Sequence, residues 1–325
     1  MFVSFGLRFR AEVEALNMAE SVGNYARHRL APIILVRRGD DGSIKEYKIT
    51  MAPAVSGQSV AYGYMAALVQ LALERKLPVS DQAKNYEKIG GFFKRADDAS
   101  LQYDDRVKTC VVEDLTGFMV AKEGGQQRGV MIRRTSPVMF SYLVPDGTSV
   151  RGVVMPQLHV RYNLQDPEAQ RPFQVEAGTA VYIQGVAIDV DRIGRLSDGS
   201  YVQDRKERVQ LAFDALKLLY GGLLFGAKKA RYNPILEPLG GIASVSDKQF
   251  VVSPPRFEDY VDFNVKRAAK YLGNVSFFCF DREGITSCGR RPQAGKQSQN
   301  EPSVTKVDTL EELIDAVKAE VLRRL

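Results

Sequence analysis

The residues best suited to bind a polyanion gather in the middle of this 325-residue chain. Residues 127 to 164 contain five arginines, one acid and no lysine, so this stretch carries +4 of the chain's net charge of +6. A mild overall excess of positive charge does not identify a partner by itself. The clustering indicates where an anionic partner would bind.

Arg133 and Arg134 stand inside that stretch, followed by two hydroxyl residues and then by Phe140 and Tyr142. Guanidinium groups interleaved with aromatic rings suit contact with a nucleic-acid backbone and stacking on its bases. A solvated strand edge is an equally good interpretation. We predict Arg133 and Arg134 as nucleic-acid contacts.

Ser56, Gln58 and Ser59 lie where the sequence predicts that a helix begins. Free N–H groups and the positive end of the helix dipole favour an anion at such a place. Plain N-capping by a serine explains the same residues and, taken alone, is the more frequent case. The three residues are therefore candidates for phosphate binding.

A glycine-rich segment, GGLLFGAKKARYNP at residues 221 to 234, comes close to a phosphate-binding loop. Ala227 stands where that motif requires a lysine, and the glycines follow a helix instead of opening one, so nucleotide hydrolysis is excluded here. Gly226 would let the backbone approach a phosphate. The cations available to a longer polyanion follow at Lys228, Lys229 and Arg231. A helix C-cap with a solvated basic turn is the alternative.

Metal-binding and catalytic patterns are not found. The two histidines, His28 and His159, show no HxxxH or HxxE spacing, and we predict neither a metal site nor a cofactor. His28 lies between two arginines, and His159 shares the polar face of a predicted strand with Arg161, which favours anion contact over nucleophile activation. A structural hydrogen bond remains the alternative for His159. The three cysteines have no CxxC spacing, which supports neither a disulfide framework nor a zinc ribbon and fits a reducing cytoplasm.

The elements that must position these residues follow from the hydropathy pattern. Unbroken alternation from residue 3 to 15 predicts a long first strand, and helical spacing predicts helices over about 56–76 and from 205 onward. Leu158, Val160 and Tyr162 alternate with polar residues, so we expect them to face the core and residues 164–173 to form a hairpin tip. Other hairpin and helix signals lie at 39–42, 258–272 and Thr309.

This order of elements predicts an α+β protein with a βαββαβ core of ferredoxin-like or RRM type. The core occupies residues 1–245. Large insertions enlarge it at 17–55 and 77–128, with the hairpin around 164–173. The mixed-charge segment after the first helix is expected to lie outside the core, and residues 246–325 to form an α/β extension.

Five segments carry a resemblance to a known family. They are LNMAESVGNYARHRLAP (16–32), PAVSGQSVAYGYMAAL (53–68), GFMVAKEGGQQRGVMIRRTSPVMFSYLVP (117–145), LHVRYNL (158–164) and FGAKKARYNP (225–234). In this order they resemble the CRISPR-associated Cas-seven (DevR) group, specifically the archaeal type I-A Cascade backbone subunit. The resemblance covers nearly all of residues 1–245 and the closing helix.

The resemblance implies a modified RRM core with a hairpin thumb and finger- or web-like elaborations, which polymerises as a right-handed helical filament along a CRISPR guide RNA. Such a scaffold presents the guide for pairing with target DNA. The residues it assigns to the guide are Asn24, Arg27, His28, Ser56, Gln58, Ser59 and His159, with the thumb at 164–173 and the glycine-rich turn at 226–231. Base pairing then reads the sequence, which explains phosphate and stacking chemistry without base-reading motifs.

Two other functions each require a residue pattern that this sequence lacks. A guide-dependent ribonuclease of the type III kind would need an aspartate in the first loop, and GNYARHRLAP contains none, with Glu20 the nearby carboxylate. A stand-alone single-stranded RNA-binding module would show an aromatic RNP pattern, which is missing. We therefore expect a cytoplasmic, non-catalytic protein without membrane contact. Its partners would be the guide RNA, target DNA through the guide, further copies of itself and other Cascade subunits.

Overall fold

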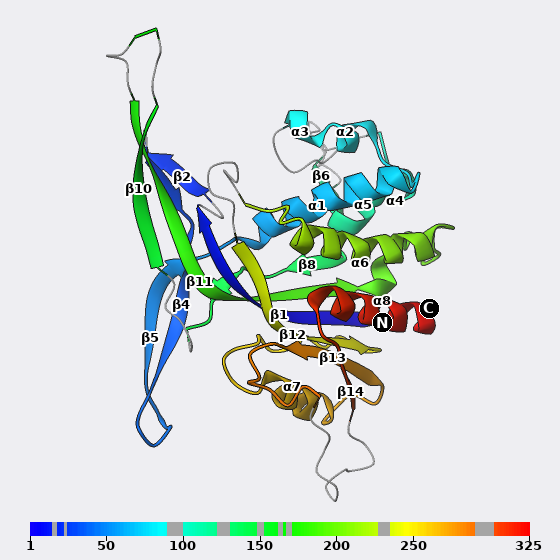
Figure 1. Cartoon of the computed structure of the whole chain (residues 1–325). Coiled ribbons are helices and arrows are strands. Elements are labelled where there is room, and N and C mark those ends of the chain that lie inside the picture. The colour runs from blue at the N-terminus through cyan, green and yellow to red at the C-terminus, as the bar shows by residue number, and fades with distance from the viewer. Residues whose placement is uncertain are drawn as a thin grey trace, which may run out of the picture.

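The long alternation at the start of the chain forms β1 (Phe2–Glu14), which lies inside the main sheet (Figure 1). The computed structural model describes residues 1–14, 18–22, 25–89, 100–121, 131–147, 153–161, 165–166, 171–226, 235–289 and 302–325. These residues form a mixed α/β protein, as predicted.

The other strands of the main sheet are β2 (Met18–Val22), β3 (Tyr25–His28), β8 (Val138–Phe140), β9 (Val144–Pro145), β10 (Val153–Arg161), β11 (Arg171–Asp189), β12 (Ile235–Ser246), β13 (Val275–Asp281) and β14 (Ser303–Lys306). Two further sheets have two strands each, β4 (Leu30–Arg38) with β5 (Ile44–Pro53), and β6 (Phe118–Ala121) with β7 (Met131–Arg134). The segment before β4, which belongs to the predicted insertion at 17–55, thus contains two short strands.

The helices are α1 (Gly57–Glu74), α2 (Asp81–Lys84), α3 (Tyr86–Ile89), α4 (Tyr103–Thr109), α5 (Val111–Thr116), α6 (Arg205–Gly221), α7 (Tyr260–Ala268) and α8 (Leu310–Arg324), with a 3₁₀ turn at Val190–Arg192. The predicted helices at 56–76 and from 205 onward are confirmed as α1 and α6. Within the described ranges, none of the helices has the length and apolar character that a membrane span requires.

Antiparallel pairing places β1 between β11 and β12, and β8 pairs antiparallel with the far edge of β11. The spatial order β12–β1–β11–β8 therefore differs from the chain order. The helix α1 follows the β4–β5 hairpin and precedes β8, and α6 connects β11 to β12. The connection through α6 thus crosses over β1, because β1 lies between β11 and β12.

The alternation along β1 separates two hydrophobic cores. Val3, Phe5 and Leu7 belong to the main core, in which α1, α6 and α8 cover one face of the sheet. The hydroxyl of Tyr64 on α1 donates to the carbonyl of Ala212 on α6 (3.0 Å), which joins the two long helices. The apolar faces of α1 and α6 therefore pack on the apolar face of β1, as the hydrophobic spacing in the sequence predicts.

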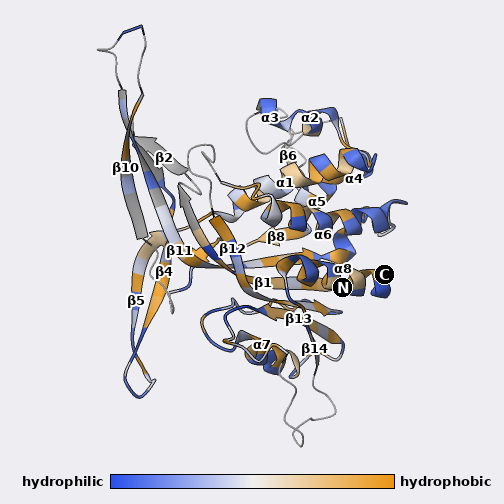
Figure 2. Ribbon diagram, viewed as in Figure 1, coloured by the Kyte–Doolittle hydropathy of each residue, from blue (hydrophilic) through white to orange (hydrophobic). Residues whose placement is uncertain are grey.

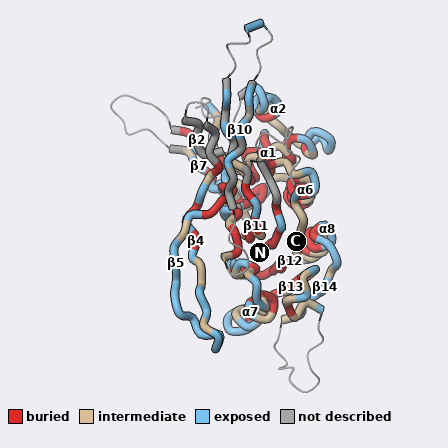
Figure 3. The backbone as a smooth tube through the Cα atoms, turned by 60° about the vertical axis from the view of Figure 1, so that its left-hand side comes forward, coloured by how far each residue is buried: buried red, intermediate tan, exposed pale blue. Residues whose placement is uncertain are grey.

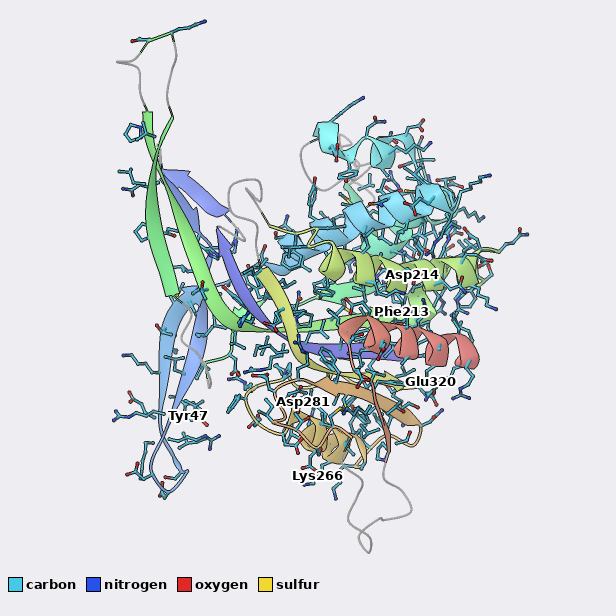
Figure 4. The ribbon with its side chains drawn as sticks, viewed as in Figure 1. Tyr47, Phe213, Asp214, Lys266, Asp281 and Glu320 are labelled. Carbon is cyan, nitrogen blue, oxygen red and sulfur yellow. A yellow bond between two sulfur atoms is a disulfide. The ribbon has the colours of Figure 1, made fainter. Side chains whose placement is uncertain are left out.

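Asp214 on α6 ties the three covering helices together. Its carboxylate accepts from Arg75 just after α1 (2.7 Å) and from Lys318 on α8 (2.7 Å). These two partners lower the pKa of Asp214, although burial acts to raise it. Figure 4 marks Asp214 on α6. The C-terminal helix is therefore part of the main body.

The opposite face of the sheet is covered by residues 247–272, where Phe250 and Tyr260 pack with Phe277 in a second core.

A disulfide closes the turn that follows β13. Asp281 accepts backbone N–H groups of this turn, and the chain reversal brings Cys288 back to Cys279, with 5.9 Å between their Cα atoms. The two cysteines form a disulfide. The expectation of no disulfide was wrong because a nine-residue separation, closed by this turn, does not follow the CxxC pattern.

The segment 77–128 also differs from its expected place outside the core. Val111 and Leu115 of α5 are fully buried in the main core. Next to them Asp114 is completely buried and accepts from Arg134, from Arg208 (3.0 Å) and from the backbone N–H of Gly194 (2.9 Å). The carboxylate thus joins α5, β7, the turn after β11 and α6.

Two hairpins project from one side of this body. The strand β11 continues past β1 and pairs with β10, and the β4–β5 hairpin extends in the other direction (Figure 1). Much of the β4–β5 hairpin is exposed along its length (Figure 3). The predicted chain reversal between about 164 and 173 is confirmed, since β10 ends at Arg161 and β11 begins at Arg171.

We predict that Asp114→Asn lowers the free energy of unfolding by about 3–5 kcal/mol, because it leaves two buried guanidiniums without their shared negative charge. Chemical denaturation monitored by circular dichroism measures this change. Asp81→Asn is the control, since that carboxylate is 88% exposed and pairs only with Lys84 on the surface, and it should shift stability by no more than about 0.5 kcal/mol. Equal effects of the two substitutions would contradict the structural role of Asp114.

Candidate nucleic-acid interface

The start of α1 lies against the strand β8. Ser56 is the N-cap, and its hydroxyl accepts from the N–H of Ser59 (3.2 Å). Gly57 lies so close to the sheet that an added Cβ would be 2.4 Å from the carbonyl oxygen of Phe140. Gln58 is exposed in the first turn. The helix therefore begins at the surface, where its first N–H groups and dipole favour an anion.

Ser141 and Tyr142, directly after β8, border this helix start. The hydroxyl of Ser141 accepts from the N–H of Gly185 on β11 (2.8 Å), and Tyr142 is 44% exposed. Gln184 is buried and accepts from the hydroxyl of Tyr220 on α6 (2.8 Å). The sequence analysis did not single out Ser141 or Gln184. A glutamine within the apolar run of β11 was the available signal, since buried polar groups are almost always hydrogen-bonded.

The glycine-rich turn after α6 packs on the same helix. An added Cβ at Gly63 of α1 would be 2.8 Å from the carbonyl oxygen of Leu224. Gly226 has a φ of +99°, which favours glycine. The structure thus brings Leu224, two residues before Gly226, against the N-terminal half of α1. The predicted cations Lys228, Lys229 and Arg231 lie outside the described residues.

His28 lies at the base of the two hairpins and is buried, with 2% exposure. Its Nδ1 contacts the carbonyl oxygen of Arg29 (2.8 Å), and its backbone N–H donates to Glu176 on β11 (2.7 Å). Burial lowers the pKa of the imidazole. This environment argues against a direct charged contact with RNA and makes His28 a residue that positions β3 against β11. Asn24 lies outside the described residues, and of Arg27 only the backbone, within β3, is described.

The β10–β11 hairpin carries His159 and Arg161, paired in register with residues 173 and 171. Leu158 is 67% exposed and Val160 is 41% exposed. The expectation that this apolar face lies in the core was therefore wrong, because the hairpin extends beyond the body that would have covered it. The side chains of His159 and Arg161 are not among those described, and Tyr162, which was also expected to face the core, lies outside the described residues.

Arg133 and Arg134 lie elsewhere. Arg134 is 4% exposed, and its guanidinium also donates to the carbonyl of Arg195 (3.2 Å), past the end of β11 opposite to the hairpin. A cavity of about 520 Å³, lined partly by Met1 and Asp191, adjoins it there. This burial corrects the prediction of a direct contact by Arg134. Arg133 is exposed, but it stands on β7 with its neighbour, away from the start of α1.

No group of three or more His, Cys, Asp or Glu side chains that could hold a metal ion occurs within the described ranges. The surface that remains combines a helix N-terminus, hydroxyl and amide side chains, an exposed tyrosine and a glycine turn. Such a set can bind phosphates along a backbone and stack on bases without reading their identity.

Several known proteins are similar to this chain. The model of the family described as "CRISPR-associated negative auto-regulator DevR/Csa2" matches residues 5–265. "CRISPR-associated protein Cas7/Csa2 1" of Saccharolobus solfataricus is 33% identical over 296 residues, which cover 84% of this chain and 89% of that protein. "CRISPR-associated protein Cas7/Cst2/DevR" of Thermoproteus tenax is 26% identical and covers 98% and 93% of the two chains.

Among solved structures, a chain of a "CRISPR RNA-guided surveillance complex" has a TM-score of 0.54 and 11% identity, covering 99% of this chain and 100% of that chain. A second, from a "CRISPR RNA-guided surveillance complex, pre-nicking", has a TM-score of 0.50 and 12% identity, covering 98% and 99%. These similarities show a shared fold.

The lowered pKa of His28 can be measured directly because the chain has only two histidines. We predict that NMR shows one imidazole titrating below the ordinary value of about 6.5, and that His28→Gln removes that signal. The pKa of His28 is lower in the folded state than in the unfolded state. The stability that the neutral imidazole contributes is therefore fully present above pH of about 6.5 and is lost as pH falls through the lower folded pKa. A His28 that titrates at or above the ordinary value would contradict the buried position.

Proposed function

Because the chain belongs to the DevR/Csa2 family of CRISPR-associated proteins, we propose that it is the guide-RNA-binding backbone subunit of a Cascade complex that acts in antiviral defence. Copies of the chain polymerise along the guide as a helical filament and hold it for pairing with target DNA. Other Cascade subunits complete the assembly in the cytoplasm. The core is of the RRM type, which the spatial order β12–β1–β11–β8 supports.

The observation that carries this proposal is the convergence of three segments on one end of the sheet. The start of α1, the turn after α6 and the residues that follow β8 meet there, next to the base of the β10–β11 hairpin. Within the described residues, the groups that we assign to RNA are the side chain and N–H of Gln58 and the ring of Tyr142, because the N–H groups of Ser59 and Val60 already donate to Ser56. Phosphates bind at the helix start, and a base stacks on the exposed ring.

The remaining proposed contacts belong to segments that are close in sequence to these elements. Asn24 and Arg27 belong to the chain before His28, and Lys228, Lys229 and Arg231 follow directly after Gly226. His159 and Arg161 stand on β10, whose hairpin acts as the thumb. The lysines and arginines of these segments neutralise successive phosphates of one RNA strand.

The subunit acts as a scaffold and not as a nuclease. Residues 16–32, which in the type III relatives would carry the catalytic aspartate, contain none. Glu20 by itself offers neither a paired base nor a metal cluster. Cleavage of the guide or target is therefore assigned to other components.

The nucleic acid that copurifies with the protein tests this proposal. RNA of uniform length with a repeat-derived end is expected, and binding of single-stranded RNA should weaken steeply with salt, by about 0.7 in log–log slope for each phosphate contact. Affinity independent of salt, or cleavage of labelled RNA in the presence of Mg²⁺ or Mn²⁺, would refute the scaffold role.

Gln58→Glu gives a sharper test of the helix start. The substitution adds a negative charge in the first turn of α1, where it should leave the fold intact or stabilise it by about 0.3–1 kcal/mol. We predict that it weakens RNA binding by about 1–3 kcal/mol, measured by fluorescence anisotropy, because the carboxylate repels the phosphate. Gln82→Glu in the first turn of α2 is the matched control and should bind RNA like the unchanged protein. Equal affinity of both variants would remove α1 from the interface.

A further inference from the structure

The outer face of the β4–β5 hairpin, formed by three cross-strand pairs, consists entirely of apolar residues. The pairs are Pro32 with Met51, Ile34 with Ile49 and Val36 with Tyr47. Ile49 is 72% exposed, Tyr47 64%, Met51 57% and Ile34 49%. Much of β4 is coloured as hydrophobic in Figure 2, and Tyr47 stands on the projecting part of the hairpin in Figure 4. No charged residue belongs to these pairs.

The inner face of the same hairpin behaves as an ordinary protein surface. Ala31, Ile33 and Ala52 are buried against the body, and Leu35 reaches Gly147, where an added Cβ would be 2.8 Å from its side chain. Further along this face the pairs are polar, such as Arg37 with Glu46. Within one copy of the chain, only the inner face of the hairpin is covered by the body. The apolar outer face can be buried only by another molecule.

The four large side chains of the outer face, each 49% or more exposed, present on the order of 500 Å² of contiguous apolar surface. Monomers seldom leave so much uncovered, and one partner in a standard protein interface contributes about 800 Å². The face carries one tyrosine and otherwise aliphatic side chains and contains no cation, so it suits an apolar protein surface better than the phosphates of RNA. The occupant is a protein.

A second surface of the same chain has matching character. Of the aromatic side chains in the described ranges that are more than half exposed, one is Tyr47 and the other three surround α7. These are Phe257 (52%), Phe263 (51%) and Tyr271 (51%), with Arg267 next to Phe263. Aromatic anchors of this kind dominate protein interfaces.

We propose that the outer face of the β4–β5 hairpin packs against the α7 surface of a second copy of this chain. The two surfaces differ, so the contact is heterologous, and repeating it produces an open chain of subunits instead of a closed dimer. This inference rests on the proposed function, which requires an open filament. It identifies the hairpin as the element through which one subunit holds the next.

Photo-crosslinking tests the occupant. A photoreactive phenylalanine analogue is placed at position 47 in the full chain, which is irradiated with and without single-stranded RNA, and the products are mapped by mass spectrometry. A cross-link from position 47 to residues 250–272 of a second copy is expected. Cross-links only within one chain, only to another region of the second copy, or only to a different subunit of the copurified complex would overturn the proposal.

Ile49→Asp tests the energetic role of the face. Assembly of several copies of this variant on long single-stranded RNA is followed by native mass spectrometry. It should require a protein concentration at least about tenfold higher, because a charge replaces an apolar side chain that the proposed interface buries. Affinity for an RNA that holds a single copy should not change. Met119→Asp is the matched control, since that residue is 57% exposed on the other two-stranded sheet.

The two proposals fail differently. If the unchanged protein does not bind RNA, the proposed function fails, and the cross-link in concentrated protein without RNA still decides whether the hairpin contacts α7. If the unchanged protein binds RNA and Ile49→Asp assembles as it does, with its melting temperature unaltered, the interface is refuted and the RNA-binding function stands.

Discussion

The continuous backbone ladder of β11 is the constraint on which the rest of the structure depends. Over one half of this 19-residue strand the partner is β1, and over the other half the partner is β10. The strand therefore belongs to the buried sheet at one end and to an exposed hairpin at the other. Because a strand has no hinge along an intact ladder, the orientation of the hairpin is set by the core.

The same strand organises the proposed RNA surface. Gly185 of β11 bonds to Ser141 and Gln184 bonds to Tyr220. His28 and Pro53 lie so close to Gly178 that an added Cβ there would be only 3.2 Å from each. Segments that are far apart in the chain thus meet beside it. A phosphate-binding surface made of backbone amides and short polar side chains needs this rigidity, because it lacks a large local charge.

Charge is used inside the molecule as well as on its surface. Arg8, Arg106 and Arg208 are among its largest fully buried side chains, each paired with a carboxylate. Arg134 has the same role toward Asp114. A positive stretch in the sequence is therefore not equivalent to a positive surface, since burying one guanidinium beside a carboxylate costs less than leaving either charge buried alone.

The sequence by itself determined the elements with a strong local period, and tertiary structure decided what covers them. The alternation of β1 and the helical spacing of α1 and α6 reflect one buried face, so those elements were predicted nearly to the residue. The start of α1, with its capping serine, was equally local. The apolar face of β10 and the buried state of His28 and Arg134 were not, because the same pattern suits a core, an interface or an ion pair. Which of these is formed depends on residues that only the folded chain brings near, as with Asp114 and Arg134 or Cys279 and Cys288.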